Sequence, residues 1–205
     1  GKIADLNSGA HFTLKESVVK NCGNNDLGSL VFANGSTYEL LDSEFSENEG
    51  QVLFVAEQGS PNNKIIQCLF HDNIISDFEL IGNKNVGTSI EIIQNTISNN
   101  NFLSFKPVVK VETGADAIIS NNIIYNNPGS IEAFEIRAGD NPSGAISSAS
   151  SNLVDIAGDL PVGSFIIGDP GFEDATNGDY RLADCAFALG RGDNSVAPAM
   201  DTEGD

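Results

Sequence analysis

A repeat of about 27 residues constrains the fold of this chain more than any other feature of its sequence. Six segments share one pattern: a short apolar stretch, a small polar residue, an apolar residue, and then a polar pair that often ends in asparagine. The aligned apolar residues, at intervals of 26, 25, 27, 27 and 30, are Val19, Phe45, Phe70, Ile97, Ile124 and Val154. One coil of this length cannot bury its apolar positions alone, so neighbouring coils must stack. The repeat therefore predicts a solenoid.

A second family of short apolar strands lies between the repeat segments, at 30–32, 52–55, 78–81, 108–111 and 134–137. Turn-forming pairs such as Asn34-Gly35 and Asn127-Pro128 separate the strands. We therefore expect an all-β fold, a right-handed parallel β-helix of about six turns with a C-terminal cap. A β-sandwich also has short strands, but it has no reason to repeat the same residue types at this interval.

The expected coils occupy residues 1–164, and residues 165–205 form the last turn and the cap. Both parts belong to one structural domain, which we expect to be a monomeric piece of a larger protein.

Small polar residues recur two places before the aligned apolar residue. They are Ser17, Ser43, Cys68, Asn95, Asn122 and Asn152. Stacking places these residues in one column, where asparagine can hydrogen-bond along the column and to its own coil. The column is interpreted as a structural ladder and not as a binding site.

The chain is strongly acidic, with 29 Asp and Glu against 10 Lys and Arg and a net charge of −19. Such a surface repels phosphate backbones and anionic lipids, which argues against nucleic-acid and membrane-surface partners. Apolar runs such as 52–56 are far too short to span a bilayer, so no direct membrane insertion is expected.

Three cysteines, Cys22, Cys68 and Cys185, show no zinc-type spacing. Buried free thiols are favoured over a disulfide, above all for Cys68 in its apolar run. The only two histidines, His11 and His71, have no metal-ligand partner at a helical or hairpin spacing, so ordinary surface roles are expected.

The final stretch, from Gly168 to Gly190, carries the most specific pattern in the chain. It resembles the closing segment of secreted bacterial β-helix proteins of the choice-of-anchor type, common in Bacteroidetes. The matching residues are Asp169, Pro170, Phe172, Asp174, Gly178, Asp179, Tyr180, Arg181 and Leu182. The segment 186–188 departs from the family's usual Ser-Pro-Ala. The resemblance implies an extracellular protein held at the cell surface.

These observations favour a non-catalytic structural or adhesive module that binds polysaccharide or another surface protein. The alternative is a polysaccharide lyase-like carbohydrate-active enzyme, because many such enzymes use this fold, although fold alone does not license the function. Lys110 and Arg137 are the best catalytic pair for that alternative. Their alignment beside Glu135 and over Glu112 is explained equally by stacked opposite charges.

Two further motifs lie near the C-terminus. Asp169, Asp174 and Asp179 are candidate Ca²⁺ ligands, but capping the solenoid end is the preferred role for their loop, and no cofactor is required. Arg191-Gly192-Asp193 matches an integrin-binding tripeptide, which we interpret as a chance occurrence.

Overall fold

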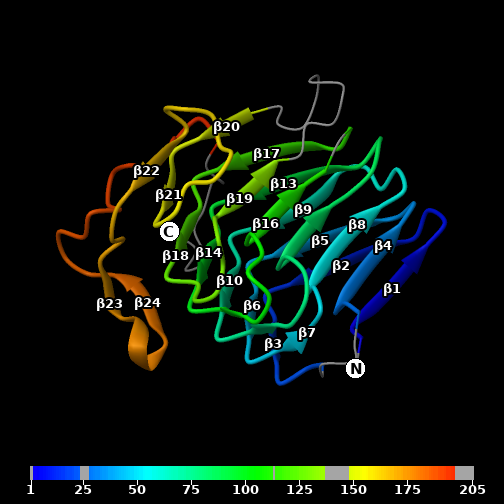
Figure 1. Cartoon of the computed structure of the whole chain (residues 1–205), viewed down its shortest axis with the longest axis horizontal. Coiled ribbons are helices and arrows are strands. Elements are labelled where there is room, and N and C mark those ends of the chain that lie inside the picture. Colours follow the sequence, from blue (N-terminus) through cyan, green and yellow to red (C-terminus); the bar gives the residue numbers. More distant parts are fainter. Residues whose placement is uncertain (1, 24–27, 113, 137–147, 197–205) are drawn as a thin grey trace.

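The computed structural model describes residues 2–23, 28–112, 114–136 and 148–196. Within these ranges the chain forms β-strands and one short 3₁₀ helix, η1 (Ala175–Asn177), and no α-helix. Parallel strands stack along one axis as a β-solenoid, seen in Figure 1 as successive arrows from blue to yellow. No helix of the described part is long and apolar enough to cross a membrane.

Three long parallel sheets form the faces of the solenoid. Sheet A stacks β1 (Ala4–Asn7), β4 (Val31–Asn34), β8 (Phe54–Glu57), β12 (Ile81–Asn83), β16 (Val109–Val111) and β19 (Phe134–Ile136). Sheet B stacks β2 (His11–Lys15), β5 (Thr37–Leu41), β9 (Asn63–Ile66), β13 (Ser89–Ile93), β17 (Asp116–Ser120) and β20 (Ser148–Ser150). Sheet C stacks β3 (Val18–Lys20), β6 (Glu44–Ser46), β10 (Leu69–His71), β14 (Thr96–Ser98), β18 (Ile123–Tyr125), β21 (Asn152–Val154) and β22 (Phe165–Ile167). A minor sheet stacks β7 (Glu49–Gly50), β11 (Ile74–Ile75) and β15 (Asn101–Phe102).

The register of sheet C confirms the alignment made from the repeat. Phe45 pairs with Val19 and Phe70, and Ile97 pairs with Phe70 and Ile124. The parallel β-helix is therefore confirmed, but it has about five turns and not six.

Aromatic rings fill the middle of the solenoid. Phe45 stacks on Phe70 with centroids 5.0 Å apart, and Phe54 meets Phe45 edge-on at 4.9 Å. All three side chains are fully buried. Each comes from the inward position of its strand, so the period-2 alternation of short strands builds one continuous core. Cys68 is buried and unbridged, as expected, and burial raises the pKa of its thiol to about 12.

Two buried ladders of polar side chains run along the solenoid beside this core. The predicted ladder is confirmed: the Asn122 side-chain oxygen accepts hydrogen bonds from the backbone and side-chain nitrogens of Asn95, at 3.0 Å each. Asn152 accepts the same pair of bonds from Asn122. A second ladder joins Asn48, Asn73, Asn100 and Asn127, which are all buried. Because every amide bonds to the next coil, the ladders hold the coils in register.

The C-terminal part closes the stack and then folds back. Leu160 is buried at the last coil as part of the hydrophobic core. After β22 the chain leaves the stack and forms an antiparallel hairpin of β23 (Phe172–Asp174) and β24 (Asp179–Leu182), which Figure 1 draws in orange beside sheet C. Residues 168–196 are called the cap below.

Candidate functional site

A long groove lies between the cap and the outer face of sheet C. It consists of three pockets of about 250, 370 and 280 Å³. Gln94 lines the first two, and Gln67 and Leu69 line the second and third. These neighbouring pockets follow one another along sheet C and are together called the cap groove below, although the cap lines only the first two.

One column of outward side chains in sheet C forms the floor of the cap groove. In stacking order these residues are Val18, Glu44, Leu69, Thr96, Ile123, Leu153 and Ile166. Parallel strands lie about 4.8 Å apart, so six intervals make a floor roughly 29 Å long. Five of the seven side chains are fully aliphatic, so the floor is largely apolar.

The corner between sheets B and C forms one wall. Each coil turns there through a residue with a left-handed backbone: Glu16, Asp42, Gln67, Gln94, Asn121 and Ser151, with φ between 46° and 59°. A non-glycine residue rarely adopts this conformation, yet here it recurs in every described coil. It turns the chain sharply enough to aim six polar side chains along one edge of the groove.

The cap forms the opposite wall and is anchored by Tyr180 on β24. Its ring lies 5.0 Å from the His71 ring on β10 and 5.3 Å from Phe172, centroid to centroid. Only 8% of Tyr180 is exposed. Burial, followed by the nearby charge of Asp72, raises the pKa of its hydroxyl to about 12. The hydroxyl therefore stays protonated at physiological pH.

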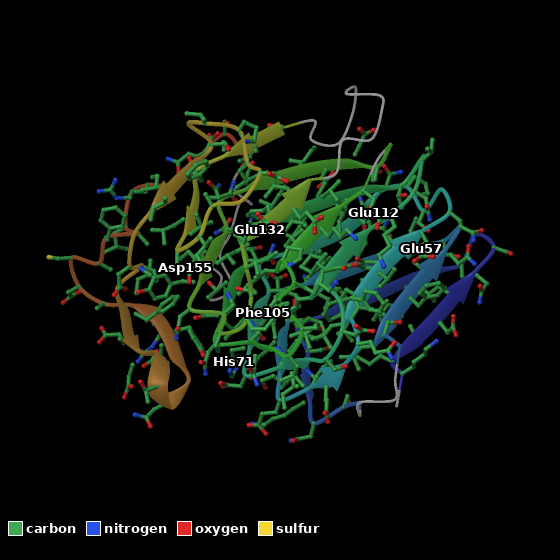
Figure 2. The ribbon with its side chains drawn as sticks, in the orientation of Figure 1. Glu57, His71, Phe105, Glu112, Glu132 and Asp155 are labelled. Atoms are coloured by element: carbon green, nitrogen blue, oxygen red, sulfur yellow. The ribbon has the colours of Figure 1, made fainter. Side chains whose placement is uncertain are left out.

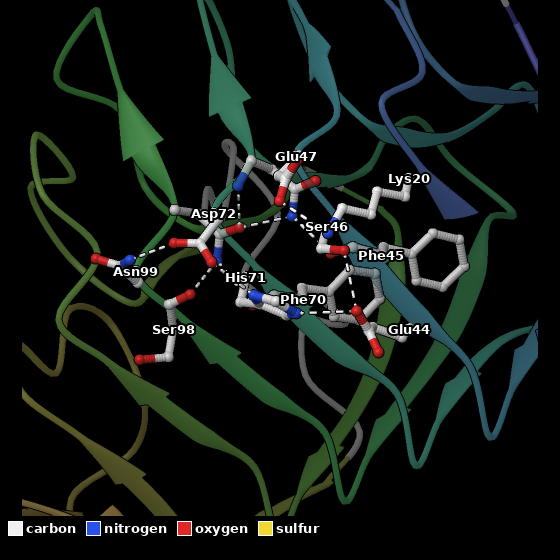
Figure 3. Close-up of polar contacts among 12 residues, drawn as sticks. Lys20, Glu44, Phe45, Ser46, Glu47, Phe70, His71, Asp72, Ser98 and Asn99 are labelled. Carbon is white, nitrogen blue, oxygen red and sulfur yellow. Dashed lines mark hydrogen bonds and ion pairs between the residues drawn. The ribbon is translucent and has the colours of Figure 1, made fainter. Parts of the chain in front are cut away.

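His71, which contacts Tyr180, is held in place by the polar network that Figure 3 draws around its ring. The His71 Nε2 lies 3.1 Å from Glu44 Oε1, and its Nδ1 lies 2.7 Å from Asp72 Oδ2. Asn99 donates to the other Asp72 oxygen, and Ser46 donates to Glu44 at 3.0 Å. The surface role expected for His71 is wrong, because the residue is only 9% exposed and links two coils to the cap.

Removing the Tyr180 ring should release the cap. Burial of a large apolar side chain contributes about 1.5–3 kcal/mol, so Tyr180→Ala should raise the open population of the cap at least tenfold. The exposed Arg181 and Arg191 are tryptic sites within this segment. We expect trypsin to cut the cap of Tyr180→Ala at least ~10-fold faster than that of the wild type. Val162→Ala, at a fully exposed position, is the control, and equal rates in both variants would contradict the anchoring role.

The far end of the cap is held by Asn121. Its side-chain nitrogen donates to the Asp193 carbonyl at 2.9 Å, and its oxygen accepts from the Asp193 N–H at 2.6 Å. The Asp193 carboxylate accepts two hydrogen bonds from Ser195, which lower its pKa. Arg191 packs 3.9 Å over the Phe187 ring and donates to the Phe187 carbonyl. The Arg-Gly-Asp tripeptide is thus fixed against the solenoid, with its aspartate engaged inside the cap.

The charges along the groove are separated. Glu16, Asp42 and Glu44 line the end near the first coil, and Arg191 and the ion pair of Arg181 with Asp179 line the cap wall. On the corner wall, neutral amides occupy the middle. Here the side-chain oxygen of Gln94 is sheltered from solvent and has no hydrogen-bond partner. A buried acceptor without a partner is costly, so a ligand with a hydroxyl or amide donor would satisfy this atom once the Gln94 side chain turns into the groove.

The structure places Lys110, the described member of the catalytic pair, away from the cap groove. Lys110 lies on β16 in sheet A, where it pairs in register with Glu135 as the sequence indicated. Its ammonium lies 3.0 Å from Glu112, which Figure 2 labels at the edge of this sheet. Arg137 lies outside the described residues. The described contacts of Lys110 are those of a paired surface charge.

The three candidate Ca²⁺ ligands are each engaged locally in the cap. Asp169 accepts the N–H of Gly171 at 2.9 Å, and Asp174 accepts the Asn177 side-chain amide at 2.6 Å. Asp179 accepts two bonds from the Arg181 guanidinium, which hold its pKa at about 2. Over the described part of the chain, no three His, Cys, Asp or Glu residues gather in a way that could hold a metal ion.

The corner wall was missed by sequence reasoning, although its signal is present. A polar residue precedes every member of the predicted ladder, from Glu16 before Ser17 to Ser151 before Asn152. The cap wall had no comparable signal, because nothing in the repeat indicates where the segment after Gly168 packs.

The chain matches no family model, no curated protein and no solved structure. Its function must therefore be argued from the site itself.

Proposed function

We propose that this protein is a non-catalytic adhesive module that binds an extended glycan chain in the cap groove. The observation that carries the proposal is the sheltered, unpartnered side-chain oxygen of Gln94, at the point where two of the pockets meet. A sugar hydroxyl can donate to this atom once the Gln94 side chain turns into the groove. Sugar rings also present apolar faces, which suit the aliphatic floor.

The shape of the groove supports a chain ligand. The floor extends over seven stacked strands, so its length suits a linear polymer better than a compact molecule. The backbone groups of sheet C already pair between coils, which leaves recognition to side chains. A peptide adding a strand to this face would find no free backbone partners.

The charge of the chain favours an uncharged ligand over an anionic one. With a net charge of −19 and three carboxylates at one end of the groove, a densely anionic polymer would be repelled. The neutral centre of Gln67, Gln94 and Asn121 instead favours an uncharged polysaccharide. An acidic, rigid solenoid with a ligand groove also fits the extracellular, surface-attached setting implied by the resemblance of its closing segment to bacterial choice-of-anchor proteins.

Retention on immobilised polysaccharides tests the proposal. The purified chain is passed over a panel of neutral and anionic polysaccharides, with and without Ca²⁺, while unsaturated product is followed near 235 nm. We expect retention on at least one neutral polysaccharide with no rise in absorbance. Rising absorbance that Lys110→Ala abolishes would establish the lyase alternative, and no retention on any polysaccharide would overturn the proposal.

Within the groove, we expect the Gln94 side chain to contribute most to the affinity for the polysaccharide. Gln94→Ala removes the sheltered acceptor, and loss of one hydrogen bond of about 1.4 kcal/mol lowers affinity about tenfold. Gln58→Ala is a matched control, since Gln58 also has a left-handed backbone, with φ 50° against 58° for Gln94, but lies outside the groove. Affinity for the retained polysaccharide, measured by calorimetry, should fall only in Gln94→Ala. An equal effect of both substitutions would contradict the placement of the ligand.

A further inference from the structure

A second pocket, of about 270 Å³, lies on the outer face of sheet A and shares no residue with the cap groove. Val52, Val55, Phe32 and Phe78 supply its apolar surfaces. The two valines are buried, whereas 38% of Phe78 is exposed. The pocket therefore offers an aromatic wall to solvent.

One glycine beside the pocket lets a buried carboxylate pack against sheet A. Asp5, Phe32, Val55 and Gly82 follow one another in the outward column of sheet A. A Cβ on Gly82 would lie 2.4 Å from Glu79 Oε1, so only glycine lets that buried carboxylate lie against the sheet. Glu79 in turn lies 3.2 Å from the Lys84 ammonium and fixes Lys84 at the rim.

The rim of the pocket balances donors and acceptors. Lys2 lies 2.9 Å from Asp5 and 5.7 Å from the centre of the Phe32 ring. Lys84 lies 3.9 Å from Glu57, which Figure 2 labels, and 5.3 Å from the centre of the Phe78 ring. Two ammonium groups and two carboxylates thus surround an aromatic surface, in a chain that is otherwise strongly acidic.

We infer that this pocket binds a single neutral sugar ring. A pyranose stacks its C–H face on an aromatic side chain, and each of its hydroxyls both donates and accepts hydrogen bonds. It can therefore donate to Asp5 and Glu57 and accept from Lys2 and Lys84 without breaking either ion pair. A purely apolar ligand would remove these charged groups from water without replacing their hydrogen bonds to it. An anion would meet the two carboxylates as well as the two ammonium groups, so the balanced rim favours a neutral ligand.

The inference does not depend on the cap groove, because the two sites lie on different sheets. It makes the module bivalent: one site for an extended chain and one for a single ring. Two sites on one rigid body raise the avidity for a branched or densely displayed glycan beyond either affinity.

Side-chain amide NMR tests the inference. The chain has four glutamines, of which Gln51 lines this pocket and Gln67 and Gln94 line the cap groove. The ¹⁵N-labelled protein is titrated with methyl glucoside, methyl galactoside and methyl mannoside. Cyclohexanol, a six-membered ring with a single hydroxyl, is titrated as the apolar comparison. For a ligand of this size we expect a Kd of about 1 mM, with shifts at Gln51 for at least one glycoside.

Variants separate this site from the groove. Phe78→Ala should lower the affinity for the glycoside about tenfold. Asp5→Asn, at an exposed rim position that leaves the core intact, should weaken it about threefold. Phe105→Ala, an exposed phenylalanine outside the pocket, and Gln94→Ala should leave the Gln51 shifts unchanged. Shifts caused by cyclohexanol but by no glycoside would show an apolar contact site, and binding unaffected by both Phe78→Ala and Asp5→Asn would also overturn the inference.

Discussion

Replacing Asn100 with alanine should destabilise the chain by about 4 kcal/mol. The Asn100 side-chain nitrogen donates to the carbonyl of Phe70 at 3.0 Å and to the Asn127 side-chain oxygen at 2.9 Å. Its oxygen accepts from the side-chain and backbone nitrogens of Asn73, at 2.7 and 3.2 Å. Alanine leaves these partners buried without hydrogen bonds, which costs about 1–3 kcal/mol for each group.

Urea unfolding followed by circular dichroism measures this loss. Asn101→Ala is the matched control, because the next residue is also asparagine but its side chain is exposed. Its stability should stay within about 0.5 kcal/mol of the wild type. If the two variants were equally stable, the second ladder would not be a structural element of the solenoid.

Phe70→Ala should cost about 4 kcal/mol through a different mechanism, the opening of a cavity in the core. Phe70 is fully buried between coils, stacked on Phe45 at 5.0 Å and edge-on to Phe54 at 5.4 Å. Neighbouring coils cannot close over the gap, because the hydrogen bonds between strands fix their spacing at about 4.8 Å. The midpoint of urea unfolding should therefore fall steeply.

Phe105→Ala provides the comparison for Phe70→Ala, since 73% of Phe105 is exposed. The same substitution there should change stability by no more than about 0.5 kcal/mol. A small effect of Phe70→Ala would mean that the stacked rings are not packed as described.

The fold could be predicted because the same packing requirement recurs in every coil. An inward apolar residue such as Phe45 must lie over its equivalent in the next coil, so its spacing in the sequence reports the register directly. The ladder residues Asn95 and Asn122 follow for the same reason, because a buried amide is satisfied only by another amide one coil away.

The cap and the two candidate sites could not be predicted in this way. Tyr180 meets His71 across a sequence separation that no repeat encodes, so the cap groove exists only once the cap has packed. At the rim of the sheet A pocket, Lys84 is held by Glu79, which packs over Gly82, and no feature of the repeat indicates this contact. Turn residues such as Gln94 were present in the repeat, but their left-handed backbone, which aims them into the groove, becomes visible only in three dimensions.

The chemical shifts of the glutamine side-chain amides test most directly whether a glycan chain lies in the cap groove. Oligosaccharide fragments of the polysaccharide that retains the protein are titrated into the ¹⁵N-labelled chain, and the four side-chain amide signals are followed. We expect saturable shifts at Gln67 and Gln94 and no shift at Gln58. Saturable binding that leaves Gln67 and Gln94 unshifted would contradict this expectation.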